Sequence, residues 1–125
     1  METKIISTDK APAAIGPYSQ AVAVGALIYT SGMIPVDPDT GHMVSGIREQ
    51  TRQALTNVKS LLEAAGSSMN KVIKTTVFIK DMNHFAAVNE VYATFFDSDP
   101  PARSCVEVSR LPKDVLIEVE AVAVK

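Results

Sequence analysis

The chain has 125 residues, of which 46% are hydrophobic and 21% are charged, and its formal net charge is −2. A chain of this length buries roughly two-thirds of its unfolded surface on folding, so we expect one domain over residues 1–125 around a single core. The slightly acidic balance, without any cluster of Lys and Arg longer than a pair, argues against a nucleic-acid partner, because affinity for nucleic acids requires concentrated positive charge.

Alternating and periodic apolar residues predict three strands, a helix, a strand, a second helix and two strands, in that order. The first helix is expected at residues 47–65, with Ser45 as its N-cap and Gly66 ending it in a left-handed turn. The second helix is expected to begin after Asp81, its N-cap, and to end before Pro100. The strands are expected at residues 4–7, 21–24, 27–32, 72–80, 103–108 and 115–124.

These elements predict a two-layer α+β domain with a six-stranded mixed sheet and two helices on one face. Two helices with one apolar stripe each can cover only one face of such a sheet. The last strand has one apolar side, formed by Ile117, Val119, Ala121 and Ala123, and one mixed side, formed by Glu118, Glu120, Val122 and Val124. An uncovered sheet face with apolar side chains usually packs against another chain, so we expect an oligomer.

The sequence gives no sign of export or of a membrane segment. Its first residues, METKIISTDK, lack the apolar stretch of a secretion signal, and no apolar run approaches the ~20 residues that span a bilayer. The single cysteine, Cys105, cannot form a disulfide within the chain. We therefore expect a cytoplasmic protein.

Most catalytic motifs are absent. The sequence contains no GxGxxG, GxxxxGK[ST] or GxSxG pattern, which argues against dinucleotide binding, a phosphate-binding loop and a nucleophile elbow. His42 and His84 each lack a second His or Cys at ligand spacing, and we interpret both as surface histidines. The sequence therefore predicts no metal site.

The most informative stretch is PPARSCVEVSRLPKD, around Arg103. If Arg103 opens a strand, it shares a face with Cys105 and Glu107. An arginine among apolar neighbours needs an anionic partner. That partner is either Glu118 or Glu120 in a salt bridge, or the carboxylate of a ligand, which the guanidinium fork matches in a bidentate way.

Five further residues have both a structural and a functional interpretation. Cys105 is a small buried hydrophobe or a nucleophile, and Ser31 is a strand-end residue or a nucleophile without a nearby base. Gly32 permits the close approach of a ligand to the backbone. Asn89 lies on an apolar helical face, so its amide needs a backbone or ligand partner. Tyr18 follows a Gly-Pro bend and either packs in the core or covers a pocket.

Dense motif matches along nearly the whole chain carry a family resemblance. They are APAAIGPYSQAV, YTSGMIPVDPDTG, TRQALTNVKSLLEAAG, VIKTTVFIKDMNHFAAVNEVYATFF and PPARSCVEVSRLPKDVLIEVEAVA. The chain resembles the RidA (YjgF-type) reactive imine deaminases. The resemblance implies a chorismate-mutase-like α+β fold, a homotrimer with sites in the clefts between neighbouring subunits, and no cofactor.

The implied activity is hydrolysis of 2-iminopropanoate and 2-iminobutanoate, unstable 2-imino acids that pyridoxal-phosphate enzymes release. Carried over to this sequence, the motifs place Arg103 on the substrate carboxylate and Glu118 near the attacking water. They place Cys105 and Gly32 at the imine through main-chain groups, and the cleft is lined by Tyr18, Ser31 and Asn89. The segment DSDPPA at residues 97–102 looks shorter than in the enterobacterial members, which affects the expected rim of this cleft.

The sequence leaves two other functions open. A regulator could bind keto acids or similar small carboxylates in the same cleft without turnover, and Glu118 would then have no catalytic role. An RNA-cleaving translation inhibitor is a role also attached to this family, and the acidic charge balance argues against it.

Overall fold

The computed structural model describes residues 1–125 and contains one six-stranded sheet with the strand order β1-β2-β3-β6-β4-β5. The only parallel pair is β4 with β5. The strands are β1 Thr3–Ile6, β2 Ala21–Val24, β3 Leu27–Thr30, β4 Val72–Ile79, β5 Ala102–Glu107 and β6 Ile117–Val124, and the helices are α1 Ile47–Ala64 and α2 Phe85–Ala93. Three short 3₁₀ turns lie at Met69–Lys71, Met82–His84 and Pro112–Asp114. The predicted mixed α+β sheet is confirmed, with strand boundaries within two residues of expectation.

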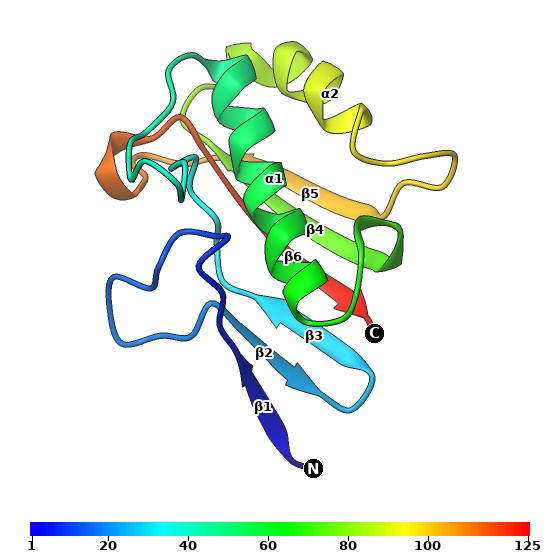
Figure 1. Ribbon diagram of the computed structural model, residues 1–125. Coiled ribbons are helices and arrows are strands. Elements are labelled where there is room, and N and C mark those ends of the chain that lie inside the picture. Colours follow the sequence, from blue (N-terminus) through cyan, green and yellow to red (C-terminus); the bar gives the residue numbers. More distant parts are fainter.

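Both helices cover the same face of the sheet (Figure 1). The apolar stripe of α1, which includes Leu55 and Leu61, packs on the buried side of β6 and β4, where Val77 and Ile117 are fully buried. Side chains in a strand alternate between the two faces, so Glu118 and Glu120 lie on the opposite, uncovered face. No helix of the chain is long and apolar enough to cross a membrane.

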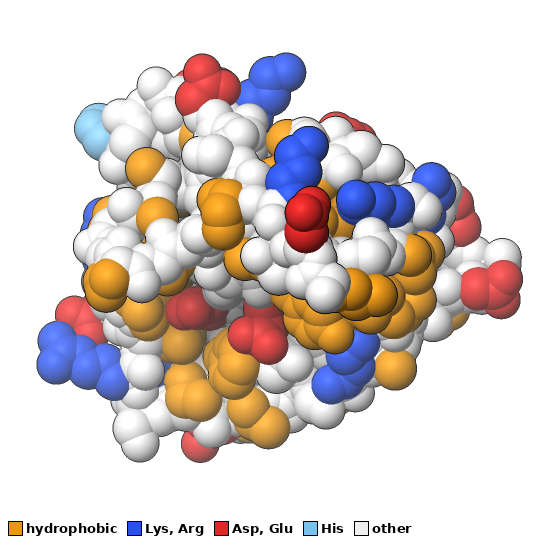
Figure 2. Space-filling model, turned by 90° about the horizontal axis from the view of Figure 1, so that it is seen from below, with side chains coloured by type: hydrophobic (Ala, Val, Ile, Leu, Met, Phe, Trp, Pro, Cys, Tyr) orange, Lys and Arg blue, Asp and Glu red, His pale blue; other side chains and the backbone are white.

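The uncovered face carries exposed apolar side chains. Ile5, Tyr29, Ile73 and Val106 are all at least 44% exposed. Seen from below, the molecule exposes hydrophobic side chains that gather around acidic ones (Figure 2). Such a face matches the expectation of an additional packing partner.

The helix ends differ from the predictions at two points. Gly46, with φ 85°, is the N-cap of α1 and no side chain caps this end, so the assignment of Ser45 as the cap is wrong. The reason is that the chain enters the helix through a left-handed residue, which leaves Ser45 one position outside. Asp81 accepts from Asn83 N at 2.9 Å, but it caps the 3₁₀ turn, and α2 begins only at Phe85. The predicted left-handed end of α1 at Gly66 is confirmed, with φ 85°.

Candidate functional site

Arg103 projects from β5 toward α2, on the helix-covered side of the sheet. Its Nη1 donates to Asn89 Oδ1 at 2.8 Å. Its guanidinium carbon lies 4.8 Å from the ring centroid of Tyr92 and 5.4 Å from that of Phe85. Aromatic faces attract cations, so the two rings hold the guanidinium in place. Asn89 therefore has a partner, and that partner is the Arg103 side chain rather than a backbone group.

The anionic partner of Arg103 is not Glu118 or Glu120. The four salt bridges of the chain do not include Arg103. In the sheet register, Arg103 lies beside Thr75, whose side chain is buried on the helix side, whereas Glu118 lies opposite Phe78 on the uncovered side. The sheet itself separates the two groups, and the guanidinium has no anionic partner within the chain.

Tyr92 forms a fixed platform under Arg103. The residue is buried, and its hydroxyl lies 2.7 Å from Thr75 Oγ1. Burial raises the pKa of this phenol above its ordinary value, so the ring stays neutral at physiological pH. The surrounding pocket has a volume of about 400 Å³ and is lined by Asn89, Tyr92, Ala93, Phe96, Asp97, Pro100, Pro101 and Arg103. We call it the arginine pocket.

Cys105 is half-buried two residues beyond Arg103 and on the same face of β5. Burial raises the pKa of its thiol, and the nearby Arg103 offsets this effect only in part. The thiol is therefore protonated at neutral pH, which disfavours a nucleophilic role because the thiolate is the reactive form.

We therefore expect Cys105→Ala to keep most of the imine-hydrolysing activity that the family resemblance implies, because the resemblance assigns a role only to main-chain groups of Cys105. Steady-state kcat and KM would be compared with those of the parent chain. A variant that is folded by circular dichroism yet inactive would contradict this expectation and would reopen covalent catalysis.

Glu118 and Gly32 form the second group of site residues, on the uncovered face. The bridge between Met33 and Val119 brings Gly32 against Glu118, and a Cβ atom at Gly32 would overlap the Glu118 carboxylate. The absence of a side chain at Gly32 permits this close approach. Burial, with a smaller contribution from Glu120, raises the pKa of Glu118 above its ordinary value. A carboxyl with a raised pKa is better suited to accept a proton near neutrality.

Ser31 and Tyr18 border the same group. Ser31 Oγ donates to Ser19 O at 2.6 Å, so its hydroxyl fixes the Tyr18 segment rather than serving as a nucleophile. Tyr18 is 46% exposed, and the interpretation that it packs in the core is therefore wrong. The cleft has a volume of about 440 Å³ and is lined by Ile15, Tyr18, Ser31, Gly32, Ile34, Pro112, Glu118 and Glu120. We call it the glutamate cleft.

The predicted site residues therefore form two groups within one chain. The arginine pocket unites Arg103 with Asn89, and Cys105 is its neighbour on β5. The other predicted residues line the glutamate cleft. Sequence reasoning missed the role of Phe85 and Tyr92 as platforms, although their spacing around Asn89, at i, i+4 and i+7 on one helix face, was a usable signal.

The two histidines differ from each other. His42 is exposed, as expected. His84 also lies at the surface, but it is only partly exposed, and its Nδ1 is buried without a hydrogen-bond partner. It is the last residue of the 3₁₀ turn and the N-cap of α2. No group of three or more His, Cys, Asp or Glu side chains could hold a metal ion.

The fold and the two groups of residues define a small α+β protein with a cationic pocket and an acidic cleft on opposite faces of one sheet. A family model described as Endoribonuclease L-PSP matches residues 8–125. A protein of Salmonella typhimurium named 2-iminobutanoate/2-iminopropanoate deaminase is 56% identical over 126 residues, and the match covers 98% of each chain. A RutC family protein of Pyrococcus horikoshii is 59% identical, with 98% of each chain covered.

Solved structures of other proteins are also similar to this chain over almost its whole length. The crystal structure of E. coli TdcF with bound serine has a TM-score of 0.95 and 54% identity, and the match covers 98% of each chain. The YjgF gene product from E. coli has a TM-score of 0.94 and 54% identity, again with 98% of each chain covered. The chain belongs to the RidA (YjgF-type) family.

Proposed function

We propose that the chain is a 2-iminobutanoate/2-iminopropanoate deaminase, which hydrolyses reactive 2-imino acids to 2-keto acids and ammonium. The observation that carries the proposal is Arg103, a guanidinium oriented by Asn89 and two aromatic rings and left without an anionic partner. The relative of Salmonella typhimurium that carries the deaminase name supports it at 56% identity.

Arg103 is proposed to bind the substrate carboxylate. A bidentate pair of an arginine and a carboxylate fixes both the position and the rotation of a small molecule, which supplies the entropic part of catalysis. One N–H of Arg103 is already used by Asn89, and this hydrogen bond sets the plane of the fork. Phe85 and Tyr92 restrict the same plane from their ring faces.

Glu118 is proposed to be the general base. It takes a proton from water while the water oxygen bonds to the imine carbon, and it returns this proton to the nitrogen, which produces a carbinolamine. Glu118 then takes the proton of the new hydroxyl as the keto group forms, and it delivers this proton to the nitrogen as the carbon–nitrogen bond breaks and ammonia leaves. These reaction steps need no covalent intermediate and no cofactor. The raised pKa of Glu118, caused first by burial, supports its role as a proton acceptor near neutrality.

The complete site is proposed to form between subunits of a homotrimer. Arg103 and Glu118 lie on opposite faces of the sheet in one chain, so within a single chain they cannot contact the same small substrate. If the uncovered face of one subunit receives the β5 edge of the next, the arginine pocket of one chain meets the glutamate cleft of another. Such an arrangement would also bury the exposed apolar side chains of that face.

Mixing two inactive variants tests this arrangement. Arg103→Ala and Glu118→Gln homotrimers should each lack activity, but trimers refolded from an equal mixture should regain about a quarter of the parent activity. The reason is that a site between an intact Arg103 and an intact Glu118 from different chains is fully native. Light scattering coupled to size exclusion must show a trimer in each sample. A stable monomer, or a mixed trimer without regained activity, would contradict the shared site.

A second candidate is a regulator that binds a small carboxylate in the same site without turnover. The structure of E. coli TdcF with bound serine favours this alternative. Freshly generated 2-iminobutanoate, trapped as its semicarbazone, distinguishes the two functions, because only an enzyme accelerates the loss of the trapped product. RNA cleavage is disfavoured by the net charge of −2, and incubation with RNA in the same preparation is the control.

A further inference from the structure

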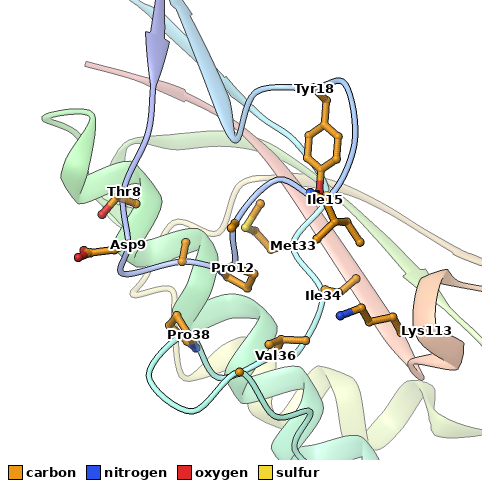
Figure 3. A pocket seen from close by; sticks show the side chains of 14 residues that line it. Thr8, Asp9, Pro12, Ile15, Tyr18, Met33, Ile34, Val36, Pro38 and Lys113 are labelled. Atoms are coloured by element: carbon orange, nitrogen blue, oxygen red, sulfur yellow. The ribbon is translucent and has the colours of Figure 1, made fainter.

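A third cavity, with a volume of about 390 Å³, lies between the segment of residues 8–18 and the segment of residues 32–41 (Figure 3). Its floor is apolar, because it contains the side chains of Ala11, Met33 and Val36, each of which is at most 8% exposed. It borders the glutamate cleft and shares Ile15, Tyr18, Gly32 and Ile34 with it, whereas Glu118 lines only the cleft. The volume is within the range of small-molecule sites. We call it the Lys113 cavity.

One wall of the Lys113 cavity is fixed by a buried glutamine. Gln20 is 5% exposed, and its Oε1 accepts from Thr8 N at 2.7 Å. Its Nε2 donates to Pro12 O at 2.8 Å and to Thr8 O at 3.0 Å. A segment without regular structure would otherwise be mobile. These hydrogen bonds hold the segment in place beside the cavity.

The opposite wall is fixed by a buried asparagine of α1. Asn57 is fully buried, and its Nδ2 donates to Ile34 O and to Val36 O, each at 2.9 Å. A buried amide with these partners satisfies carbonyl groups that the irregular segment would leave unpaired. Both walls are therefore held by side chains of regular elements or their ends, and the cavity is present before any ligand arrives.

Lys113 supplies a positive charge at the mouth of the cavity. Lys113 and Asp114 both have φ 55°, a conformation that costs free energy for residues other than glycine. The Arg110 side chain pairs with Asp114, with Nε 2.9 Å from Oδ1, and braces this turn. The Lys113 side chain itself has no ion pair and no hydrogen bond. In Figure 3 its ammonium points toward the cavity beside Ile34, whereas the Asp9 carboxylate points away.

We propose that the Lys113 cavity is a second binding site that takes a small aliphatic monocarboxylate. The alkyl chain lies on the apolar floor near Met33 and Val36, and the carboxylate pairs with the Lys113 ammonium. The Lys113 ammonium is the one cation that points into the cavity, so it matches a ligand with one negative charge. It repels an alkylammonium ion whose alkyl chain is as long as that of the carboxylate. This site borders the glutamate cleft but contains neither Arg103 nor Glu118, so binding to it is measured without the proposed deaminase activity.

Hexanoate is the probe for the test, and hexylammonium is its matched opposite. The full-length Arg103→Ala protein is titrated with each probe while amide chemical shifts are recorded, so that the arginine pocket cannot account for carboxylate binding. Hexanoate is expected to bind saturably, with a Kd of about millimolar for so small a ligand, and to shift the amides of Val36 and Gly41. Hexylammonium is expected to give no saturable shifts.

Two variants separate the charge from the apolar floor. Lys113→Gln, added to the Arg103→Ala protein, changes an exposed side chain and should weaken hexanoate binding about tenfold or more. Val36→Phe should abolish it by filling the cavity, with the thermal midpoint as the check on folding. Lys10→Gln, an exposed lysine near the cavity that does not line it, is the control and should leave the Kd unchanged. The proposal would be overturned if hexanoate did not bind saturably, if both probes bound with equal affinity, or if Lys113→Gln left the Kd for hexanoate unchanged.

Discussion

Replacing Arg103 by lysine is expected to lower kcat/KM for 2-iminobutanoate by about a hundredfold or more while the fold is retained. Each charge-assisted hydrogen bond contributes roughly 1.5 to 3 kcal/mol, and lysine cannot supply the bidentate pair. Lysine would also lose the planar group that stacks against Phe85 and Tyr92. The rate of semicarbazone loss with freshly generated imine measures the effect, and thermal unfolding reports the fold.

The matched control for this substitution is Arg48→Lys. Arg48 forms an exposed ion pair with Glu90, neither residue lines the arginine pocket or the glutamate cleft, and such surface pairs contribute little. Arg48→Lys should therefore retain the parent kcat/KM. A near-native kcat/KM in Arg103→Lys would disprove the carboxylate clamp, whatever the source of the remaining activity.

Glu118→Gln is expected to lower kcat by ~10² to 10⁴, the range typical of general base catalysis, with a smaller effect on KM. The variant should be at least as stable as the parent chain at neutral pH. The sign follows from the raised pKa of Glu118, since burial disfavours the ionised carboxylate in the folded state and neutral glutamine removes this cost. A rate loss without a loss of stability would thus be a chemical effect.

The pH profile adds a second measurement to this prediction. The reaction needs ionised Glu118, so kcat/KM should fall as the pH decreases through its raised pKa, at a higher pH than for an ordinary glutamate. Glu120→Gln removes the like charge that contributes to this shift, so it should move the acidic limb to lower pH and retain most of the activity. Parent-like single-turnover rates in Glu118→Gln would rule out the general base.

The order and the faces of the elements were predictable because the local sequence sets them. Alternation in residues 117–124 indicated which side of β6 is buried, and the same rule placed Arg103 and Cys105 on one face of β5. The relation between these two strands was not predictable in the same way. β4 lies between them in the sheet, and only its register shows that Arg103 and Glu118 face opposite sides.

The loops were less predictable than the strands. Core packing was one of two options for Tyr18, whereas the structure leaves it exposed at the cleft. Its position depends on Gln20 and Ser31, whose hydrogen bonds reach residues 12 positions away in sequence. Side chains that satisfy distant backbone groups leave no periodic pattern, which is why the Lys113 cavity and its anchors were not foreseen.

The placement of Arg103 and Glu118 on opposite faces of one sheet has a kinetic consequence. If neither face can work alone, catalytic capacity becomes a property of the assembly, and dilution below the dissociation constant of the assembly should decrease activity per subunit by mass action. A folded but isolated chain would then be inactive. In dilute samples the total reaction rate would rise with a higher power of protein concentration than the first.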